Sequence, residues 1–322
     1  MKKYKILYYN ILNYSIDNLR FMNEYFDVST LNDPAEDKIE ILKTIDVILA
    51  PLGYFIGKDK IDNCKNLKVI GSNTTGHPHI DVDYASKVGI RVVTLKNHRD
   101  FLNKITPTAE LTWGLIIALT RNIIFAYDSV IQGKWSRWPF GGKQMLSRMT
   151  LGVVGLGRLG KMVATYGICF GMQVYYYDPY INSVNLQIER LNSLEDLVRL
   201  SDIVTVHIPY EFKTKMIFNY RIFSNFKKGG FFINTSRGEI VNEEALIKHL
   251  ESGHLAGAAV DVLSGEFETG FKRKLYKNTL VDYAKRNRNL IITPHIGGST
   301  KDAWELTQKY ALEQIIRTLE GC

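Results

Sequence analysis

Short apolar runs alternate with polar, helix-like segments over the first 95 residues. The runs are KILYY (5–9), VILA (47–50), KVIGS (68–72) and IRVVTL (90–95), and each has the length of a buried strand. Segments such as AEDKIEILKTI (35–45), with apolar residues at helical spacing, lie between them. Strands that alternate with helices predict a parallel sheet.

A second alternation of the same kind begins at residue 150. Helical patterns at 158–170, 194–200, 219–226 and 242–252 separate most of its strands. About six parallel strands with intervening helices are typical of a doubly wound dinucleotide-binding domain. The predicted strands are 150–155, 173–178, 202–208, 230–235, 256–262 and 290–295.

Two helical patterns stand outside the alternations. Residues 106–135 form one long apolar pattern that predicts a buried helix, and the pattern at 300–320 is expected to pack back on the first domain. The predicted fold class is α/β with two doubly wound parallel-sheet domains. A Rossmann NAD-binding domain, residues 99–298, is inserted into a flavodoxin-like substrate domain made of residues 1–98 and 299–322.

Bulk composition excludes several classes of protein. The chain has 322 residues, 45% of them hydrophobic, and a formal net charge of +8. Its basic residues are scattered, which argues against nucleic-acid binding. Three well-separated cysteines predict neither a disulfide framework nor a metal site, and they suit the cytoplasm. The N-terminal residues lack the apolar block of a signal peptide, and no window has the roughly 18 apolar residues of a membrane span.

The segment TLGVVGLGRLG (150–160) carries the candidate cofactor chemistry. Gly155, Gly157 and Gly160 form a G-x-G-x-x-G pattern between an apolar strand and a helical pattern. In a dinucleotide site the first glycine permits a tight turn, the second lets backbone N–H groups approach a pyrophosphate, and the third lets the helix pack closely on the strand. The positive end of the helix then faces the phosphates. The same pattern also occurs at ordinary corners of α/β proteins.

Asp178 ends the next predicted strand. A carboxylate at this position accepts hydrogen bonds from the adenosine ribose and repels a 2′-phosphate, which favours NAD over NADP. No arginine in the following DPYINS reverses that preference. The alternative is that Asp178 is only a turn residue before Pro179.

Three residues that suit acid–base and carboxylate chemistry follow or end predicted strands of the second series: Arg237, Glu266 and His295. In open α/β sheets the ligand crevice lies at the carboxyl ends of the strands. Arginine can grip a substrate carboxylate and polarise the adjacent carbonyl, histidine can exchange a proton with its oxygen, and glutamate can orient the histidine. Together they suffice for moving a hydride to or from a 2-hydroxy acid.

Each of these residues also has a purely structural interpretation. His295 after Thr-Pro suits an ordinary loop residue, Arg237 suits a helix cap or a pair with Glu239, and Glu266 suits a solvated loop charge. Their shared position behind a phosphate-type glycine turn favours the functional interpretation.

Four long motifs resemble the D-isomer-specific 2-hydroxyacid dehydrogenase family. They are GVVGLGRLGKMVA, VHIPYEFKTKMIF, KKGGFFINTSRGEIVNEEALIKHLESGHLAGAAVDVLSGE and ITPHIGGST, and the likeness covers most of 68–300. The resemblance implies that Arg237, Glu266 and His295 are the catalytic set and that NAD is the cofactor. It also implies cofactor contacts at Arg158, Leu159, His207, Thr214, Thr235 and Asp261, the last with the nicotinamide carboxamide.

The resemblance further implies a loop over the substrate carboxylate. GSNTTGHPHID (71–81) occupies that position, so the backbone N–H groups of Thr75 and Gly76 are candidate substrate ligands. His77 and Pro78 depart from the usual residues there, and either is also explained by turn chemistry.

A second departure is KNHRDFLNKITPTAEL (96–111), which is longer than the usual link into the following helix. Arg99 and Lys104 in this link are either ligands of a distal anionic group of the substrate, such as a phosphate, or surface charges.

These observations predict an NAD-dependent dehydrogenase of a small D-2-hydroxy or 2-oxo acid, with 3-phosphoglycerate as one candidate. The site is expected in the cleft between the domains. The alternative is a catalytically silent NAD(H)-sensing protein of corepressor type, against which the intact arginine, glutamate and histidine argue. A third candidate, an enzyme that oxidises another donor such as formate, lacks the polar residues expected around that substrate.

No nucleic acid, membrane or metal is expected as a partner. A homodimer is implied by the resemblance, and Trp135 and Trp138 are either packing residues or dimer contacts.

Overall fold

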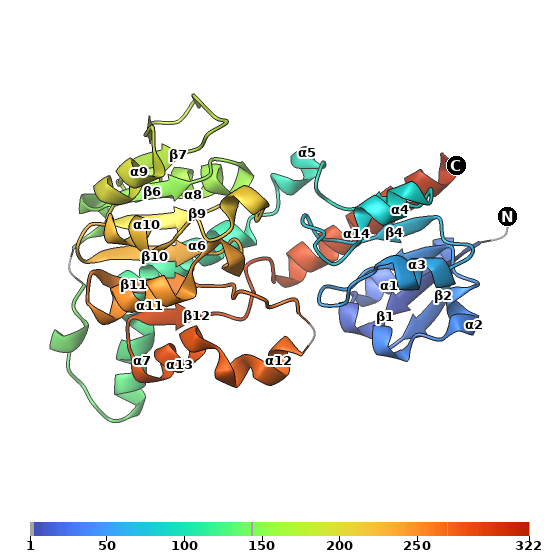
Figure 1. Cartoon of the computed structure of the whole chain (residues 1–322), viewed down its shortest axis with the longest axis horizontal. Helices are drawn as coiled ribbons and strands as arrows, with labels where there is room; N and C mark the ends of the chain where they lie inside the picture. The colour runs from blue at the N-terminus through green and yellow to red at the C-terminus, as the bar shows by residue number, and fades with distance from the viewer. Residues whose placement is uncertain (1–2, 143, 269, 322) are drawn as a thin grey trace. The chain divides into compact units, whose positions relative to one another are not determined.

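The computed structural model describes residues 3–142, 144–268 and 270–321, which fold into two compact units, each built on one parallel sheet (Figure 1). The first unit consists of Met1–Ile105, Phe267–Thr269 and Ser299–Cys322, and the second of Thr106–Glu266 and Gly270–Gly298.

The first unit therefore extends to Ile105, beyond residue 98, where the sequence pattern suggested the boundary. Residues 99–105 belong to it because they pack on its C-terminal helix. The ring of Phe101 stacks on Tyr310 with centroids 3.9 Å apart, and Tyr310 also shares a 3.0 Å hydrogen bond with His98 Nδ1.

The five strands of the first unit lie in the order β2-β1-β3-β4-β5, all parallel, which is the flavodoxin-like order. The carboxyl end of β4 leads directly into the 71–81 segment. The elements of this unit are β1 (Tyr4–Tyr9), α1 (Ile16–Tyr25), β2 (Phe26–Leu31), α2 (Ile39–Leu42), β3 (Val47–Leu49), α3 (Lys58–Asn63), β4 (Val69–Gly71), α4 (Val82–Lys87), β5 (Arg91–Val93), α5 (Arg99–Leu102) and α14 (Lys301–Glu320).

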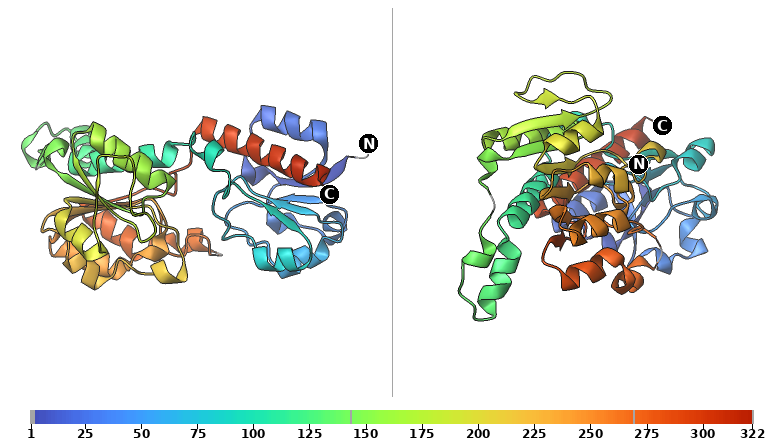
Figure 2. Two further views of the ribbon diagram at one scale, coloured as in Figure 1. Left: turned by 90° about the horizontal axis from the view of Figure 1, so that it is seen from above. Right: turned by 60° about the vertical axis from the view of Figure 1, so that its left-hand side comes forward.

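The last helix, α14, lies beside α1 in the first unit, as the sequence pattern predicts (Figure 2). Leu312 and Ile315 of α14 are fully buried in the core of this unit. Asn18 of α1 donates hydrogen bonds to the Glu305 carbonyl at 2.9 Å and to Gln308 Oε1 at 3.0 Å. Residues from the two ends of the chain therefore complete one domain.

The seven strands of the second unit are also parallel, in the order β12-β11-β10-β9-β6-β7-β8. The chain reverses its direction across the sheet between β6 and β9, which is where doubly wound sheets bind ligands. The elements are α6 (Pro107–Thr120), α7 (Ile123–Ile131), β6 (Thr150–Val154), α8 (Arg158–Cys169), β7 (Gln173–Tyr177), β8 (Glu189–Arg190), α9 (Leu194–Leu200), β9 (Ile203–Val206), α10 (Tyr220–Ser224), β10 (Gly230–Asn234), α11 (Glu243–Glu251), β11 (Leu255–Val260), α12 (Phe271–Lys274), α13 (Thr279–Arg286) and β12 (Leu290–Ile292).

The single long helix predicted over 106–135 is wrong. The structure has two helices there, α6 and α7, because Asn122 adopts a left-handed conformation with φ of 53°. Asparagine tolerates this conformation better than most residues, and it ends the regular hydrogen-bond ladder. Apolar periodicity continues across the break and therefore conceals it.

Within the described residues, no single helix is both long and apolar enough to cross a membrane. Only the pair Arg99–Thr120 and Ile123–Ile131, bent by 61°, satisfies the length and composition criteria together. Much of α6 is buried inside the second unit.

Candidate active site

The three glycines of the β6–α8 turn differ in what surrounds them. Gly155 has φ of 87°, and a Cβ there would lie 2.8 Å from the His207 carbonyl oxygen. A Cβ on Gly160 would overlap the Gly155 carbonyl oxygen, so this glycine lets α8 approach the turn closely. A Cβ on Gly157 would meet no atom within 4 Å. The space in front of Gly157 is therefore open for a ligand to approach the backbone.

The N-terminus of α8 is suited to an anion. Its N-cap, Gly157, has no side chain that could cap the first N–H groups, and the first turn has no acidic residue. Arg158 adds a partly buried guanidinium. Burial lowers the pKa of this group, but the group stays charged. Leu159 packs its side chain against the core under the sheet. The turn and helix fit the pyrophosphate of a dinucleotide.

Asp178 is buried just past the end of β7, with 7% of its surface exposed. Its Oδ2 accepts a 2.8 Å hydrogen bond from Leu156 N, inside the glycine turn. Its Oδ1 accepts from Tyr180 N and Ile181 N at 2.8 and 3.1 Å. A carboxylate offers about four acceptor positions, so the turn role uses most but not all of them. The ribose contact expected of Asp178 stays a prediction.

The other predicted cofactor residues lie at the same edge of the sheet. His207 follows β9, and desolvation of its ring lowers its pKa to about 3, so the imidazole is neutral. Thr214 caps its own loop, donating to the Pro209 carbonyl and accepting from Glu211 N. Thr235 is buried and shares a 2.8 Å hydrogen bond with Thr112. The two threonine hydroxyls thus have structural partners within the unit.

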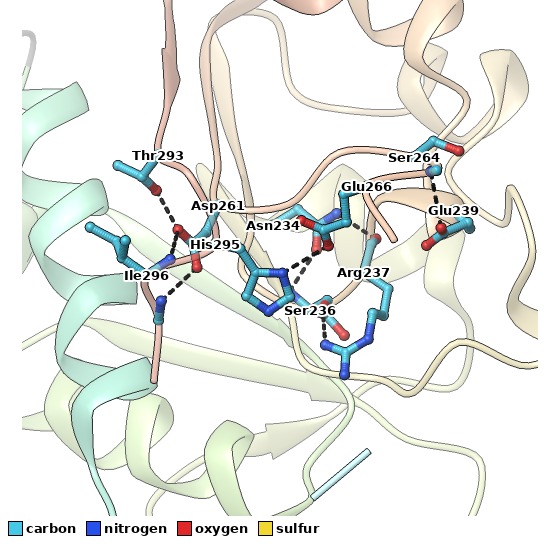
Figure 3. Close-up of polar contacts among 12 residues, drawn as sticks. Asn234, Ser236, Arg237, Glu239, Asp261, Ser264, Glu266, Thr293, His295 and Ile296 are labelled. Atoms are coloured by element: carbon cyan, nitrogen blue, oxygen red, sulfur yellow. Dashed lines mark hydrogen bonds and ion pairs between the residues drawn. The ribbon is translucent and has the colours of Figure 1, made fainter. Parts of the chain in front are cut away.

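Backbone hydrogen bonds join the loops that follow β10, β11 and β12. Asp261 N donates to the Asn234 carbonyl at 2.9 Å, and His295 N donates to the Asp261 carbonyl at 2.8 Å. These bonds continue the sheet ladder beyond the strand ends. They bring Arg237, Glu266 and His295 to one edge of the sheet, on three neighbouring loops (Figure 3).

Asp261 is 1% exposed, and its carboxylate holds the loop that carries His295. Oδ1 accepts from the Thr293 hydroxyl at 2.6 Å and from Ile296 N at 2.9 Å, and Oδ2 accepts from Gly297 N at 2.7 Å. His295 itself has φ of 53°, a left-handed conformation that is uncommon outside glycine. The nicotinamide contact expected of Asp261 stays a prediction, and the structure assigns it a loop-holding role.

His295 and Glu266 contact each other through their side chains. Nδ1 of the imidazole lies 2.8 Å from Glu266 Oε1, and the two side chains are 31% and 11% exposed (Figure 3). A carboxylate at Nδ1 favours a proton on that nitrogen and orients the imidazole ring. The solvated-charge interpretation of Glu266 is therefore wrong.

Arg237 is held by its own turn. The buried Asn234 side chain donates to the Arg237 carbonyl at 2.9 Å and accepts from Ser236 N at 2.9 Å. Arg237 Nη1 donates to the Ser236 carbonyl at 2.6 Å, and Ser236 Oγ donates to the Ile208 carbonyl. Asn234 and Ser236 did not stand out in the sequence, although an Asn-Thr-Ser run after a strand is itself a turn signal.

In the first unit, a chain of polar side chains supports the Thr75–Gly76 loop. Ser72 Oγ contacts His79 Nε2 at 3.1 Å and Thr74 Oγ1 at 2.9 Å, and Thr74 donates to the Gly76 carbonyl at 2.6 Å. His79 is buried, which lowers its pKa to about 4 and keeps it neutral. In the described part of the chain, the Thr75 and Gly76 amides donate to no other group, so they suit an oxyanion.

One further feature near the glycine turn was missed from the sequence. Arg190, on the unpredicted strand β8, donates through Nη2 to the Asp178 carbonyl at 3.4 Å. Arg99 and Lys104 are exposed on and after α5. The ligand role of Arg99 and Lys104 stays a prediction.

Comparison with known proteins identifies the class. Residues 113–297 match the family described as "D-isomer specific 2-hydroxyacid dehydrogenase, NAD binding domain". Hydroxypyruvate reductase of Thermotoga maritima is 31% identical over 320 residues, covering 99% of each chain. D-3-phosphoglycerate dehydrogenase of Bacillus subtilis is 34% identical over 309 residues, covering 95% of this chain and 56% of that protein.

Among solved structures, D-lactate dehydrogenase from Aquifex aeolicus, complexed with NAD and lactic acid, superposes with a TM-score of 0.83 at 26% identity. The match covers 99% of this chain and 96% of that one. This chain belongs to the D-isomer specific 2-hydroxyacid dehydrogenase family, and its second unit contains the NAD-binding domain. The resemblance, the fold class and the cofactor predicted from the sequence are confirmed. The chain spans about half the length of the phosphoglycerate dehydrogenases it matches.

The glycine turn provides a direct test of the cofactor site. Gly157→Ala adds a methyl group where the protein itself has room, so thermal unfolding should shift little while NADH affinity falls roughly tenfold or more. Gly160→Ala forces α8 away from the turn and should lower both NADH affinity and the unfolding temperature. Fluorescence titration with NADH and thermal melts measure the two effects. Equal NADH affinity in Gly157→Ala and the unaltered protein would contradict the assignment.

Proposed function

We propose that this chain is an NAD-dependent dehydrogenase that moves a hydride between nicotinamide and C2 of a small D-2-hydroxy or 2-oxo acid. The observation that carries the proposal is the 2.8 Å contact between His295 Nδ1 and Glu266 Oε1, at the sheet edge that also bears Arg237. Relatives named hydroxypyruvate reductase and D-3-phosphoglycerate dehydrogenase support this substrate class. None of the relatives or solved structures reported above is named as a sensor, which favours the enzyme over a silent protein.

Arg237 supplies the charge that recognises the substrate. One of its N–H groups donates to the Ser236 carbonyl, which holds the guanidinium in place and leaves further donors for a ligand. The planar fork binds a carboxylate through paired hydrogen bonds and draws electron density from the adjacent carbonyl. In the first unit, the Thr75 and Gly76 amides are the proposed donors to a substrate oxygen.

His295 exchanges the proton. In reduction, protonated His295 donates from Nε2 to the substrate oxygen, and Glu266 stabilises the positive ring beforehand. In oxidation, the neutral ring accepts the hydroxyl proton at the same atom. The 155–160 glycine turn and the N-terminus of α8 would hold NAD or NADH, which would supply the hydride-transfer chemistry when bound. Glu266 keeps Nδ1 protonated in both directions, so only Nε2 changes state.

We also propose that the substrate carries a second anionic group, as 3-phosphoglycerate does. The names of several relatives support this proposal. Arg99 and Lys104 are the proposed ligands of that group, because both are exposed cations in the first unit.

A homodimer built on the second unit is also part of the proposal. Its support is a concentration of exposed apolar side chains on α7 and the segment after it, which is typical of a protein interface. Trp135 and Trp138 are 91% and 85% exposed, so packing within the chain does not explain them. The exposed apolar residues are Ile123, Ile124, Tyr127, Val130, Ile131, Trp135 and Trp138.

The cytoplasm is the proposed compartment, since Cys64 and Cys169 are both free thiols.

The substrate class is tested with a panel of 2-oxo acids, with and without a phosphate group, assayed by loss of NADH absorbance. Arg237→Ala should lower kcat/KM by roughly 100-fold or more on every active substrate, because a charged contact to the substrate carboxylate is lost. Arg237→Lys should recover part of the lost kcat/KM.

Arg99→Ala and Lys104→Ala should raise KM only for the phosphorylated substrate in the same panel. No turnover of any acid by the unaltered protein would refute the proposed activity.

The proton-transfer role predicts opposite pH trends for the two directions. Reduction requires protonated His295, so kcat/KM should fall as pH rises, whereas oxidation requires the neutral ring, so kcat/KM should rise. The measurement is kcat/KM in both directions between about pH 5 and about pH 9. His295→Gln should flatten both profiles. Parallel trends in the two directions would assign the proton to another group.

The dimer is tested by placing charge in the apolar surface of α7. Ile131→Glu should shift the molar mass measured by light scattering from dimer to monomer, because an unpaired carboxylate would be buried in the interface. Ile16→Glu is the matched control, since Ile16 is similarly exposed but lies in the first unit. A dimer that survives Ile131→Glu, or a monomeric unaltered protein, argues for a different interface or none.

A further inference from the structure

A tight turn at residues 263–266 carries Glu266 to His295. The Leu263 carbonyl accepts a 3.3 Å hydrogen bond from Glu266 N, and Gly265 has φ of 73°. A positive φ at the third position is typical of a type II turn and favours glycine. The backbone of this turn therefore decides where the Glu266 carboxylate lies relative to the imidazole.

Two other carboxylates hold the middle of this turn. Glu243 Oε1 accepts a 3.0 Å hydrogen bond from Ser264 N, and Glu239 Oε1 accepts a 3.1 Å hydrogen bond from Gly265 N. Figure 3 shows Glu239 and Ser264 together at this turn. The N–H groups of the two central residues of the turn, Ser264 and Gly265, thus each donate to a carboxylate. Such charge-assisted hydrogen bonds are stronger than neutral ones.

The two carboxylates come from the segment that follows Arg237. Glu239 lies in a single 3-10 turn, Gly238–Ile240, and Glu243 in the first turn of α11. Gly238 lets this segment touch the 263–266 turn, because a Cβ there would overlap Leu263 C and Ser264 N. The chain that bears Arg237 and the turn that bears Glu266 are therefore locked to each other.

This arrangement has an electrostatic cost. Burial raises the pKa of Glu243, and the nearby charge of Glu239 raises it further. The next residue, Glu244, lies in the same first turn of α11. Glu244 is exposed and supplies the favourable negative charge at the helix N-terminus without touching the turn. Glu243 differs from Glu244 in accepting a hydrogen bond from Ser264 N, and it also has a side-chain hydrogen bond with Asn278.

We propose that Glu239 and Glu243 are positioning residues that clamp the 263–266 turn so that Glu266 orients His295. This inference rests on the proposed function, in which the His295–Glu266 pair transfers the proton. The clamp acts through the backbone of the turn, and neither carboxylate is required to touch substrate or cofactor.

The test compares Glu243→Ala and the Glu239→Ala/Glu243→Ala double variant with Glu243→Gln and the control Glu244→Ala. Hydrogen exchange of a peptide covering residues 262–267, followed by mass spectrometry, reports on the clamp directly. Steady-state kinetics with NADH and the best 2-oxo acid report on its consequence. Glutamine keeps an oxygen acceptor for Ser264 N without the charge, so it should rescue most of the alanine defect.

The expected result is faster exchange of the 262–267 peptide in Glu243→Ala, with kcat lowered roughly 10- to 100-fold and KM for NADH nearly unchanged. The double variant should be at least as impaired, and Glu244→Ala should match the unaltered protein in both measurements. Unchanged exchange in the double variant would overturn the clamp. Faster exchange with kcat equal to that of Glu244→Ala would overturn its positioning role.

The two proposals fail in distinguishable ways. If the unaltered protein turns over no 2-oxo acid, the proposed function fails while exchange still tests the clamp. If the unaltered protein is active and the Glu243 variants behave like Glu244→Ala, the function stands and the clamp is wrong.

Discussion

The buried carboxylate of Asp261 is the interaction on which the candidate active site depends. A charge with 1% exposure would be strongly unfavourable without partners, and its two oxygens accept three hydrogen bonds from Thr293, Ile296 and Gly297. Those bonds curl the chain around His295 and sustain its left-handed backbone. The imidazole then projects to within 2.8 Å of Glu266. One anion therefore sets the geometry from which the acid–base chemistry follows.

Carboxylate side chains of the second unit have different structural roles at neighbouring positions. Asp178 accepts three backbone amides around the glycine turn, and Asp261 organises the His295 loop. Glu239 and Glu243 hold the turn of Glu266, and the Glu266 carboxylate contacts the His295 imidazole. Backbone amides at the ends of parallel strands point outward without partners, and acidic side chains satisfy them. The loops of the site are thus hydrogen-bonded to one another through these carboxylates.

Most of the fold was predictable because burial repeats with the period of the element. Nearly every apolar run became a strand within a residue or two, and the switch point fell at the glycine turn. The exceptions share a cause. Strand β2 (FDVSTL) is at a sheet edge and mixes exposed with buried residues, and β8 has only two residues, so neither forms an apolar run. The break at Asn122 is a left-handed backbone conformation at one residue, with apolar helical patterns on both sides.

The sequence by itself determined which chemical groups were present and on which strand ends they lay. Arg237, Glu266 and His295 were identifiable because parallel strands deliver their carboxyl ends to one edge, whatever the loops do. Only the tertiary structure decided which partner each charge has. Glu266 meets a histidine 29 residues away, and Glu239 and Glu243 meet amides 26 and 21 residues away. Hydrogen bonds require positions accurate to a fraction of an ångström, and that accuracy arises from how the loops pack, which no local pattern of residues encodes.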